Sequence, residues 1–167
     1  MGSVVSHYTT LTTVWVNWAL CQLKPNVFVM MLDGRLPVDP LYEDDSLIVI
    51  KDKFPAADHH YLVIPKRRIR AWTSLKKTDL PLVQHMYEVG QEVIKQQGGG
   101  ELQVFYGFMT PPFNTQMQLH MHCISWPMRL EGVHASAMHI SQFKQVSDLL
   151  EELSDDQHTS TTVTAKL

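Results

Sequence analysis

The sequence has few of the features that mark several large classes of protein. It holds 2 cysteines in 167 residues, Cys21 and Cys123, and they form no CxxC pair. We therefore expect neither a disulfide framework nor a cysteine zinc site, and the low cysteine content favours a reducing compartment. The formal net charge of −3 provides no general field that would attract nucleic acid.

No apolar run is long enough to cross a bilayer, which takes about 20 residues. The most apolar stretch of residues 1–24 is interrupted by Thr12, Thr13 and Asn17. No Lys or Arg precedes Lys24, although a signal peptide would begin with basic residues. We therefore expect residues 1–25 to be an atypical, disordered N-terminal segment that does not enter a membrane.

What the sequence does contain is a single domain over residues 26–153. The 44% hydrophobic and 19% charged residues are ordinary for a globular protein of this size. The tail over residues 154–167 has almost nothing to bury, so we expect it to be disordered.

Short β-rich runs alternate with turn residues in this domain. The expected strands cover 46–50, 60–65, 102–108 and 118–124. Apolar residues at helical spacing from 82 to 94 predict one long helix, with Thr78 as its N-cap and glycines 98–100 at its end. A short C-terminal helix over 147–153 would have Ser147 as its N-cap. This order predicts an α+β fold, in which helices gather on an antiparallel sheet of about five strands.

Two histidines, His120 and His122, stand one residue apart in an apolar run, and Gln118 precedes them. On a strand these three side chains would share one face, because successive residues alternate between the two faces.

Three interpretations fit that polar stripe. It could be a half-exposed strand face without chemistry, or a pair of metal ligands completed by other histidines such as His59, His60, His134 or His139. It could also be a site where a neutral imidazole attacks phosphorus. The spacing alone does not separate the last two.

The flanking residues suit a nucleotide. Asn114 and Thr115 offer an amide and a hydroxyl to phosphate oxygens, although both are also common turn formers. Asp52 lies in a loop, where a carboxylate can hold both hydroxyls of a ribose or can simply be solvated.

Two quoted stretches resemble the histidine triad (HIT) superfamily: "DKFPAADHHYLVIPKRRI" and, further on, "GFMTPPFNTQMQLHMHCI". They are most similar to the Hint branch, in particular to the type 3 histidine triad nucleotide-binding proteins, with aprataxin a more distant relative. The resemblance covers residues 27–153 and implies a HIT-like fold.

The resemblance also implies catalytic roles. His120 stands at the position of the family's nucleophile, and His122 at that of the histidine that contacts the phosphate. His60 corresponds to a supporting histidine. Gln118 replaces the first histidine of the triad, and an amide does not titrate near neutral pH. We therefore expect retained nucleotide binding and reduced hydrolysis.

Further residues match the family's nucleotide-binding positions. Asp52 would hold the ribose hydroxyls, and Thr115, next to Asn114, stands where the family has a serine that touches the α-phosphate. Lys53 departs from the apolar residue expected at the base. Asn26 and Val29 stand where some relatives have zinc-binding cysteines, and the family's transfer chemistry implies neither a metal nor another cofactor.

The implied function is a nucleotide-binding hydrolase or transferase of the adenosine 5'-monophosphoramidase type. It would act on the α-phosphate of purine nucleoside 5'-phosphoramidates through a nucleotidyl-histidine. Two alternatives stay open: a nucleotide-binding regulatory protein with weakened catalysis, and aprataxin-like removal of adenylate from nucleic-acid ends. The relatives imply a cytoplasmic and also nuclear protein that can form a homodimer. We expect an AMP-like ligand and no nucleic acid.

Overall fold

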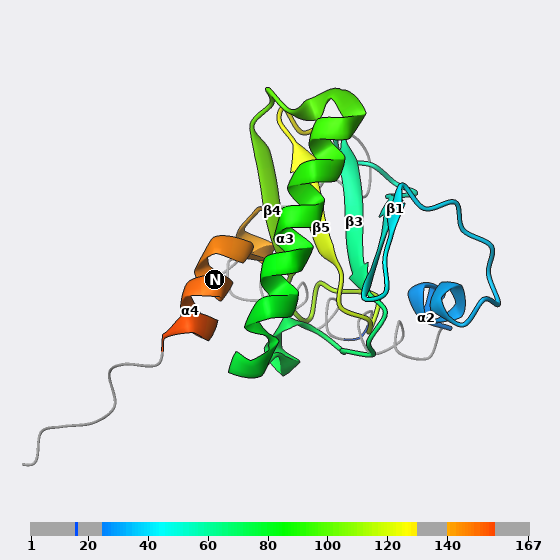
Figure 1. Ribbon diagram of the computed structural model, residues 1–167, viewed down its shortest axis with the longest axis vertical. Coiled ribbons are helices and arrows are strands. Elements are labelled where there is room, and N and C mark those ends of the chain that lie inside the picture. The colour runs from blue at the N-terminus through cyan, green and yellow to red at the C-terminus, as the bar shows by residue number, and fades with distance from the viewer. Residues whose placement is uncertain (1–15, 17–24, 130–139, 156–167) are drawn as a thin grey trace, which may run out of the picture.

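The computed structural model describes residues 16, 25–129 and 140–155, which contain one six-stranded antiparallel sheet (Figure 1). The strands lie in the order β1-β2-β3-β5-β4-β6. Their bounds are Tyr42–Glu43 (β1), Leu47–Lys51 (β2), His60–Pro65 (β3), Val104–Met109 (β4), Met121–Ser125 (β5) and Phe143–Gln145 (β6). The predicted α+β class is confirmed, and two short edge strands bring the number to six rather than about five.

The α-helices are α2 (Val27–Leu32), α3 (Leu80–Ile94) and α4 (Val146–Ser154). Short 3-10 turns, η1 (Trp72–Ser74), η2 (Lys77–Asp79) and η4 (Ile140–Gln142), and a π-helical turn, η3 (Lys95–Gly99), connect the regular elements. No helix in the described part of the chain is long and apolar enough to cross a membrane.

One face of the sheet packs against α3, which runs along the central strands (Figure 1). The helix buries residues at the predicted helical spacing, among them Val83, Met86 and Val93. On the sheet side of this core lie Met121 and Cys123 of β5, both with no exposed surface.

The opposite face of the sheet carries the polar stripe. In the register of β3 and β5, His60 lies opposite Ile124 and His122 lies opposite Leu62. Both histidines therefore point away from α3. A smaller core on this face holds Phe28 of α2 against β2 and β3. The predicted alternation is therefore confirmed from Met121 onward, with His122 on the face opposite Met121 and Cys123.

The start of α3 differs from the prediction. Thr78 is not the N-cap, because it lies inside the 3-10 turn η2, which ends in Asp79 just before Leu80. The Asp79 carboxylate accepts hydrogen bonds from the Lys76 backbone amide at 2.9 Å and from the Arg67 guanidinium at 2.5 Å. The end was predicted correctly: Gly98 has φ +86°, which stops the helical path.

Two other boundaries also differ. Helix α4 begins at Val146 after Gln145, so Ser147 is its second residue rather than its cap. Strand β5 begins at Met121 instead of residue 118, because the Leu119 amide bonds to the Ile69 carbonyl at 2.6 Å rather than to a neighbouring strand. The predicted disordered segments 1–25 and 154–167 lie almost wholly outside the described residues and stay predictions.

Candidate functional site

Three histidines from two strands and one loop meet on the face of the sheet opposite α3. The His60 Nε2 and His122 Nδ1 atoms are 2.9 Å apart. The ring of His120, which precedes β5, lies 4.9 Å from the ring of His122, centroid to centroid. The sheet register thus brings together residues that are 62 positions apart in the chain.

A backbone amide sets the tautomers of His60 and His122. The Ala56 N–H donates to His60 Nδ1 at 3.0 Å, so the proton of a neutral His60 sits on Nε2. That proton is donated to His122 Nδ1, which leaves the proton of a neutral His122 on its own Nε2. His122 Nε2 is buried and has no hydrogen-bond partner among the described residues. It is therefore an N–H donor available to a ligand.

A backbone carbonyl sets the tautomer of His120. Its Nδ1 donates to the Gln118 carbonyl oxygen at 2.7 Å. Because a carbonyl only accepts, Nδ1 carries the proton and Nε2 keeps its lone pair. His120 and His122 thus present opposite properties at Nε2: a nucleophile on one ring and a proton donor on the next.

Burial keeps all three rings neutral near pH 7. It lowers the pKa of His60 to about 4, and the nearby His120 adds to this effect. Burial also lowers the pKa of His122 well below its ordinary value, with further contributions from His120 and His60. For His120 burial again lowers the pKa, although the bond to the Gln118 carbonyl works in the opposite direction. A neutral imidazole is the form that can attack an electrophile.

The nucleotide-binding candidates take different positions. The Asp52 carboxylate reaches to within 3.4 Å of His60 Nε2, and its other oxygen accepts from the Phe54 amide at 2.8 Å. Lys53, in contrast, is exposed and lies with its Nζ 5.6 Å from the centre of the Phe54 ring. The structure therefore places Asp52 at the histidines and turns Lys53 toward a surface aromatic ring.

Asn114 and Thr115 lie in the loop before β5. Asn114 is buried, and its amide donates to the Met117 sulfur at 3.8 Å. Thr115 is exposed, with a hydroxyl that no described residue binds. Asn114 and His120 line one small pocket beside this loop.

The side chain of Gln118 forms its hydrogen bonds with backbone carbonyls rather than with the imidazoles. Its buried amide donates to the Pro65 carbonyl at 2.8 Å and to the Arg67 carbonyl at 3.0 Å. Only its backbone oxygen contacts His120. The expectation that this side chain replaces a third imidazole in the reaction has no contact to support it.

Three residues at the site have no role in the sequence interpretation. Phe28 of α2 lies 4.9 Å from His120 between ring centres, and Phe143 of β6 meets His122 edge-on at 5.2 Å. Ala56 is a third, since its amide sets the tautomers. An isolated Phe or Ala carries no sequence signal for such a role, because the contact depends on how distant segments pack.

The residues Asp52, His60 and His122 could hold a metal ion by proximity, since their ligand atoms lie within 4.8 Å of one another. The chemistry of the donor set argues against it. The bond from Ala56 makes His60 Nε2 a proton donor, and a protonated nitrogen has no lone pair for a metal.

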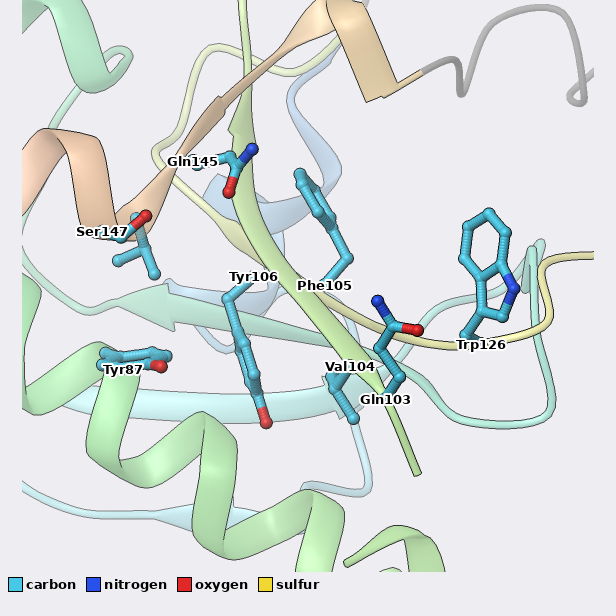
Figure 2. A pocket seen from close by; sticks show the side chains of 9 residues that line it. Tyr87, Gln103, Val104, Phe105, Tyr106, Trp126, Gln145 and Ser147 are labelled. Carbon is cyan, nitrogen blue, oxygen red and sulfur yellow. The ribbon is translucent and has the colours of Figure 1, made fainter. Parts of the chain in front are cut away.

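A cavity of about 570 Å³ lies away from the histidines, beside β4 (Figure 2). Its lining includes Tyr87, Val104, Tyr106 and Trp126. None of the predicted site residues lines it, so this cavity and the histidine cluster are separate features.

Comparison with known proteins agrees with the fold. The family model described as scavenger mRNA decapping enzyme C-terminal binding matches residues 26–139. A solved HIT family hydrolase from Clostridium thermocellum has a TM-score of 0.57 and 26% identity, over 61% of this chain and 90% of that one. The chain belongs to the histidine triad superfamily.

Within that superfamily the chain is similar to adenosine 5'-monophosphoramidase HINT3 of Mus musculus, with 32% identity over 76% of this chain and 80% of that protein. It is 40% identical to the bifunctional adenosine 5'-phosphosulfate phosphorylase/adenylylsulfatase HINT4 of Arabidopsis thaliana over 52% of this chain. That match spans only 60% of the length of the Arabidopsis protein. Aprataxins of Ciona intestinalis and Gallus gallus match as well.

Proposed function

We propose that the protein is a nucleotide-binding hydrolase or transferase that acts on the α-phosphate of purine nucleoside 5'-phosphoramidates. The observation that carries the proposal is the pair of fixed tautomers: a lone pair on His120 Nε2 beside an N–H on His122 Nε2. Such a pair can attack phosphorus and bind a phosphoryl oxygen at the same time. The similarity to adenosine 5'-monophosphoramidases supports this substrate class.

The proposed reaction has two steps. His120 Nε2 forms a bond to the α-phosphorus while the bond from phosphorus to the amine nitrogen breaks, and the amine leaves with a proton from water. A water molecule then attacks the phosphorus, releases its own proton to solvent, and displaces the neutral imidazole of His120. His122 donates its Nε2 proton in a hydrogen bond to a phosphoryl oxygen in both steps.

The remaining residues bind the nucleotide in this proposal. Asp52 takes the ribose hydroxyls, while Thr115 and Asn114 offer hydrogen bonds to the phosphate. Lys53 would contact the edge of the base only after its side chain turns away from the Phe54 ring. His60 holds His122 in the tautomer that donates. No metal or other cofactor enters the reaction, and we propose that it takes place in the cytoplasm and the nucleus.

The test is turnover of adenosine 5'-phosphoramidate by wild type and His120→Ala. We expect the variant to lose about 1,000-fold or more in kcat, because it has no nucleophile. Acid quenching of wild type should leave a nucleotidyl group on the protein, and the variant should carry none. His85→Ala is the matched control, because His85 lies on α3 and pairs with Asp44 outside the site.

A His120→Ala rate within a factor of ten of wild type would contradict the proposal. Binding of AMP without any turnover by wild type would instead favour the regulatory alternative.

The aprataxin-like alternative receives little support from the basic cluster after β3. Lys66 pairs with Glu43, Arg67 with Asp79, and Arg68 with Asp33. Cations held by acidic partners within the chain contribute less to phosphate binding than free ones. Salt-dependent binding of adenylated DNA by this protein would reverse that conclusion.

We also propose a homodimer, formed through the open edge of β4. The Gln103 carbonyl accepts a hydrogen bond from the Trp126 amide at 2.7 Å, on the side of β4 that faces β5. Backbone groups alternate between the two sides of a strand, so those of Val104 and Tyr106 point away from β5. Strand β6 pairs only with the far half of β4, from Gly107 onward. Among the described residues no strand residue lies opposite Val104 on that edge.

That short edge is self-complementary. If two copies pair antiparallel about Val104, this residue of each copy lies opposite the same residue of the other, and the pair forms two hydrogen bonds. The cavity beside the edge supplies aromatic surface on both sides, with Trp126 47% exposed (Figure 2). A second copy is therefore the partner that this edge fits.

A further inference from the structure

Gln118 forms hydrogen bonds with three residues: Pro65, Arg67 and His120. Its side-chain amide group carries two protons, and it donates one to each of two backbone carbonyls, those of Pro65 and Arg67. The side chain is only 1% exposed, so water does not compete for these bonds. The two acceptors lie at the end of β3 and just beyond it, 53 and 51 positions away in the chain.

The same residue orients the candidate nucleophile. The Gln118 backbone oxygen is the acceptor that fixes the Nδ1 proton of His120, at 2.7 Å. The next residue, Leu119, donates its amide to the Ile69 carbonyl at 2.6 Å. The segment 118–119 is thus fastened to segment 65–69 by three hydrogen bonds, and the oxygen that orients His120 sits within the fastened segment.

A histidine could not reproduce these contacts. A neutral imidazole has one N–H and could satisfy only one of the two carbonyls. A doubly protonated imidazole has two, but burial disfavours the charged form. An amide matches the pair of acceptors without a charge. A glutamine at position 118 therefore matches the two carbonyl acceptors around it. The residue is not simply a replacement for histidine that can no longer titrate.

We propose that Gln118 is a positioning residue for His120: its two-carbonyl clamp holds the backbone oxygen that fixes the nucleophile's tautomer and orientation. The inference rests on the proposed function for its kinetic consequence, whereas its structural content is independent of any activity. It follows that full turnover needs no titrating group at position 118. The presence of Gln118 in place of the first triad histidine then does not lower the rate of hydrolysis. We therefore expect ordinary hydrolysis instead of the reduced hydrolysis expected from the sequence.

The first test uses wild type alone. Nitrogen NMR of protein labelled with ¹⁵N in histidine and glutamine distinguishes protonated from unprotonated ring nitrogens. We expect His120 to be protonated at Nδ1 and bare at Nε2 near pH 7, and both Gln118 Nε2 protons to exchange slowly with solvent. A His120 protonated at Nε2, or rapidly exchanging Gln118 amide protons, would overturn the proposal whatever the enzyme does.

The second test compares Gln118→Met with Gln118→His. Methionine has nearly the length of glutamine but donates no hydrogen bond, and histidine keeps one donor. We expect the NMR signature of His120 to become a mixture of tautomers in Gln118→Met, and kcat on adenosine 5'-phosphoramidate to fall about 10- to 100-fold with KM within about twofold. Gln118→His should be slower than wild type, with an unchanged number of ionisations in its pH–rate profile.

Gln97→His is the matched control, because it makes the same substitution at an exposed position of η3. A Gln118→His variant that is faster than wild type would show that the amide is a defect and would refute the clamp. A Gln118→Met variant with wild-type kcat and an unchanged His120 signature would do the same. If wild type shows the expected tautomer but no turnover, the proposed function fails and the positioning role stands.

Discussion

At the scale of single residues, the chemistry of the site depends on which ring nitrogen carries a proton. Two backbone groups, the amide of Ala56 and the carbonyl of Gln118, decide this for three imidazoles. Without these backbone groups each ring could adopt either neutral tautomer, because the two tautomers of an imidazole differ little in energy. Backbone groups cannot change their donor or acceptor character, so the assignment is permanent.

The buried histidines should make the protein less stable as the pH falls from about 6.5 to about 4. In the unfolded chain His60 takes up a proton near pH 6.5, whereas in the folded protein burial lowers its pKa to about 4. Between these values the unfolded state binds more protons, so stability is complete above the unfolded pKa and is lost toward the folded one. For His60 alone we expect the free energy of unfolding to fall by about 3 kcal/mol.

Urea unfolding between pH 7 and pH 4 measures this effect. A His60→Asn variant should show a smaller pH dependence, and the slope is compared rather than the absolute stability. Asp44 and Asp79, whose pKa values are lowered by their hydrogen bonds, lose their stabilising contributions at still lower pH. A stability that stays constant over the window would contradict the neutral, buried state of the rings.

At the scale of elements, the position of β5 depends on how closely α3 approaches it. A Cβ on Gly90 would lie 2.8 Å from the Cys123 sulfur and 2.9 Å from the end of Met121. Only glycine lets the helix come this near to the strand that carries His122. The core on one face of the sheet therefore supports the site on the other.

We expect Gly90→Ala to destabilise the protein by about 1–2 kcal/mol. Overpacking costs about 1–3 kcal/mol, and the better helix propensity of alanine recovers about 0.5–1 kcal/mol of it. Thermal or urea unfolding measures the change, and Gln91→Ala, at an exposed position of the same helix, is the control.

The pair Gly90→Ala with Cys123→Ala should lose less than the sum of the two single changes, because removal of the sulfur makes room for the new methyl group. Simple additivity of the two changes would mean that the close approach does not limit this position.

At the scale of the whole molecule, the proposed dimer predicts a continuous sheet that crosses the two-fold axis at β4. Light scattering after size exclusion should give twice the mass of one chain. Val104→Pro removes a backbone donor at the open edge and should shift the protein to the monomer. Because proline also disturbs a strand, Val104→Ile is the control that keeps the backbone donor and should remain dimeric.

A monomer at all concentrations for wild type would contradict the dimer. A dimer that survives Val104→Pro in a folded protein would place the interface elsewhere.

The sequence by itself determined the order of the elements and the face on which the histidines lie. Period-two alternation in β5 and helical spacing in α3 are local properties, so the pattern of apolar and polar residues was enough to predict them. The two motifs likewise identified the superfamily. Element ends were predicted less well, as Thr78 and Ser147 show, because neighbouring turns compete for the same backbone groups.

Only the tertiary structure decided what Gln118 contacts, which nitrogen of each imidazole carries the proton, and that Phe28 and Phe143 lie against the rings. The reason is physical. The partners that settle these questions are mainly backbone groups or rings from distant segments, and every residue has a backbone carbonyl and all except proline a backbone amide N–H. No residue type marks them in advance, so they are defined only once the chain brings residues 65–67 beside residue 118.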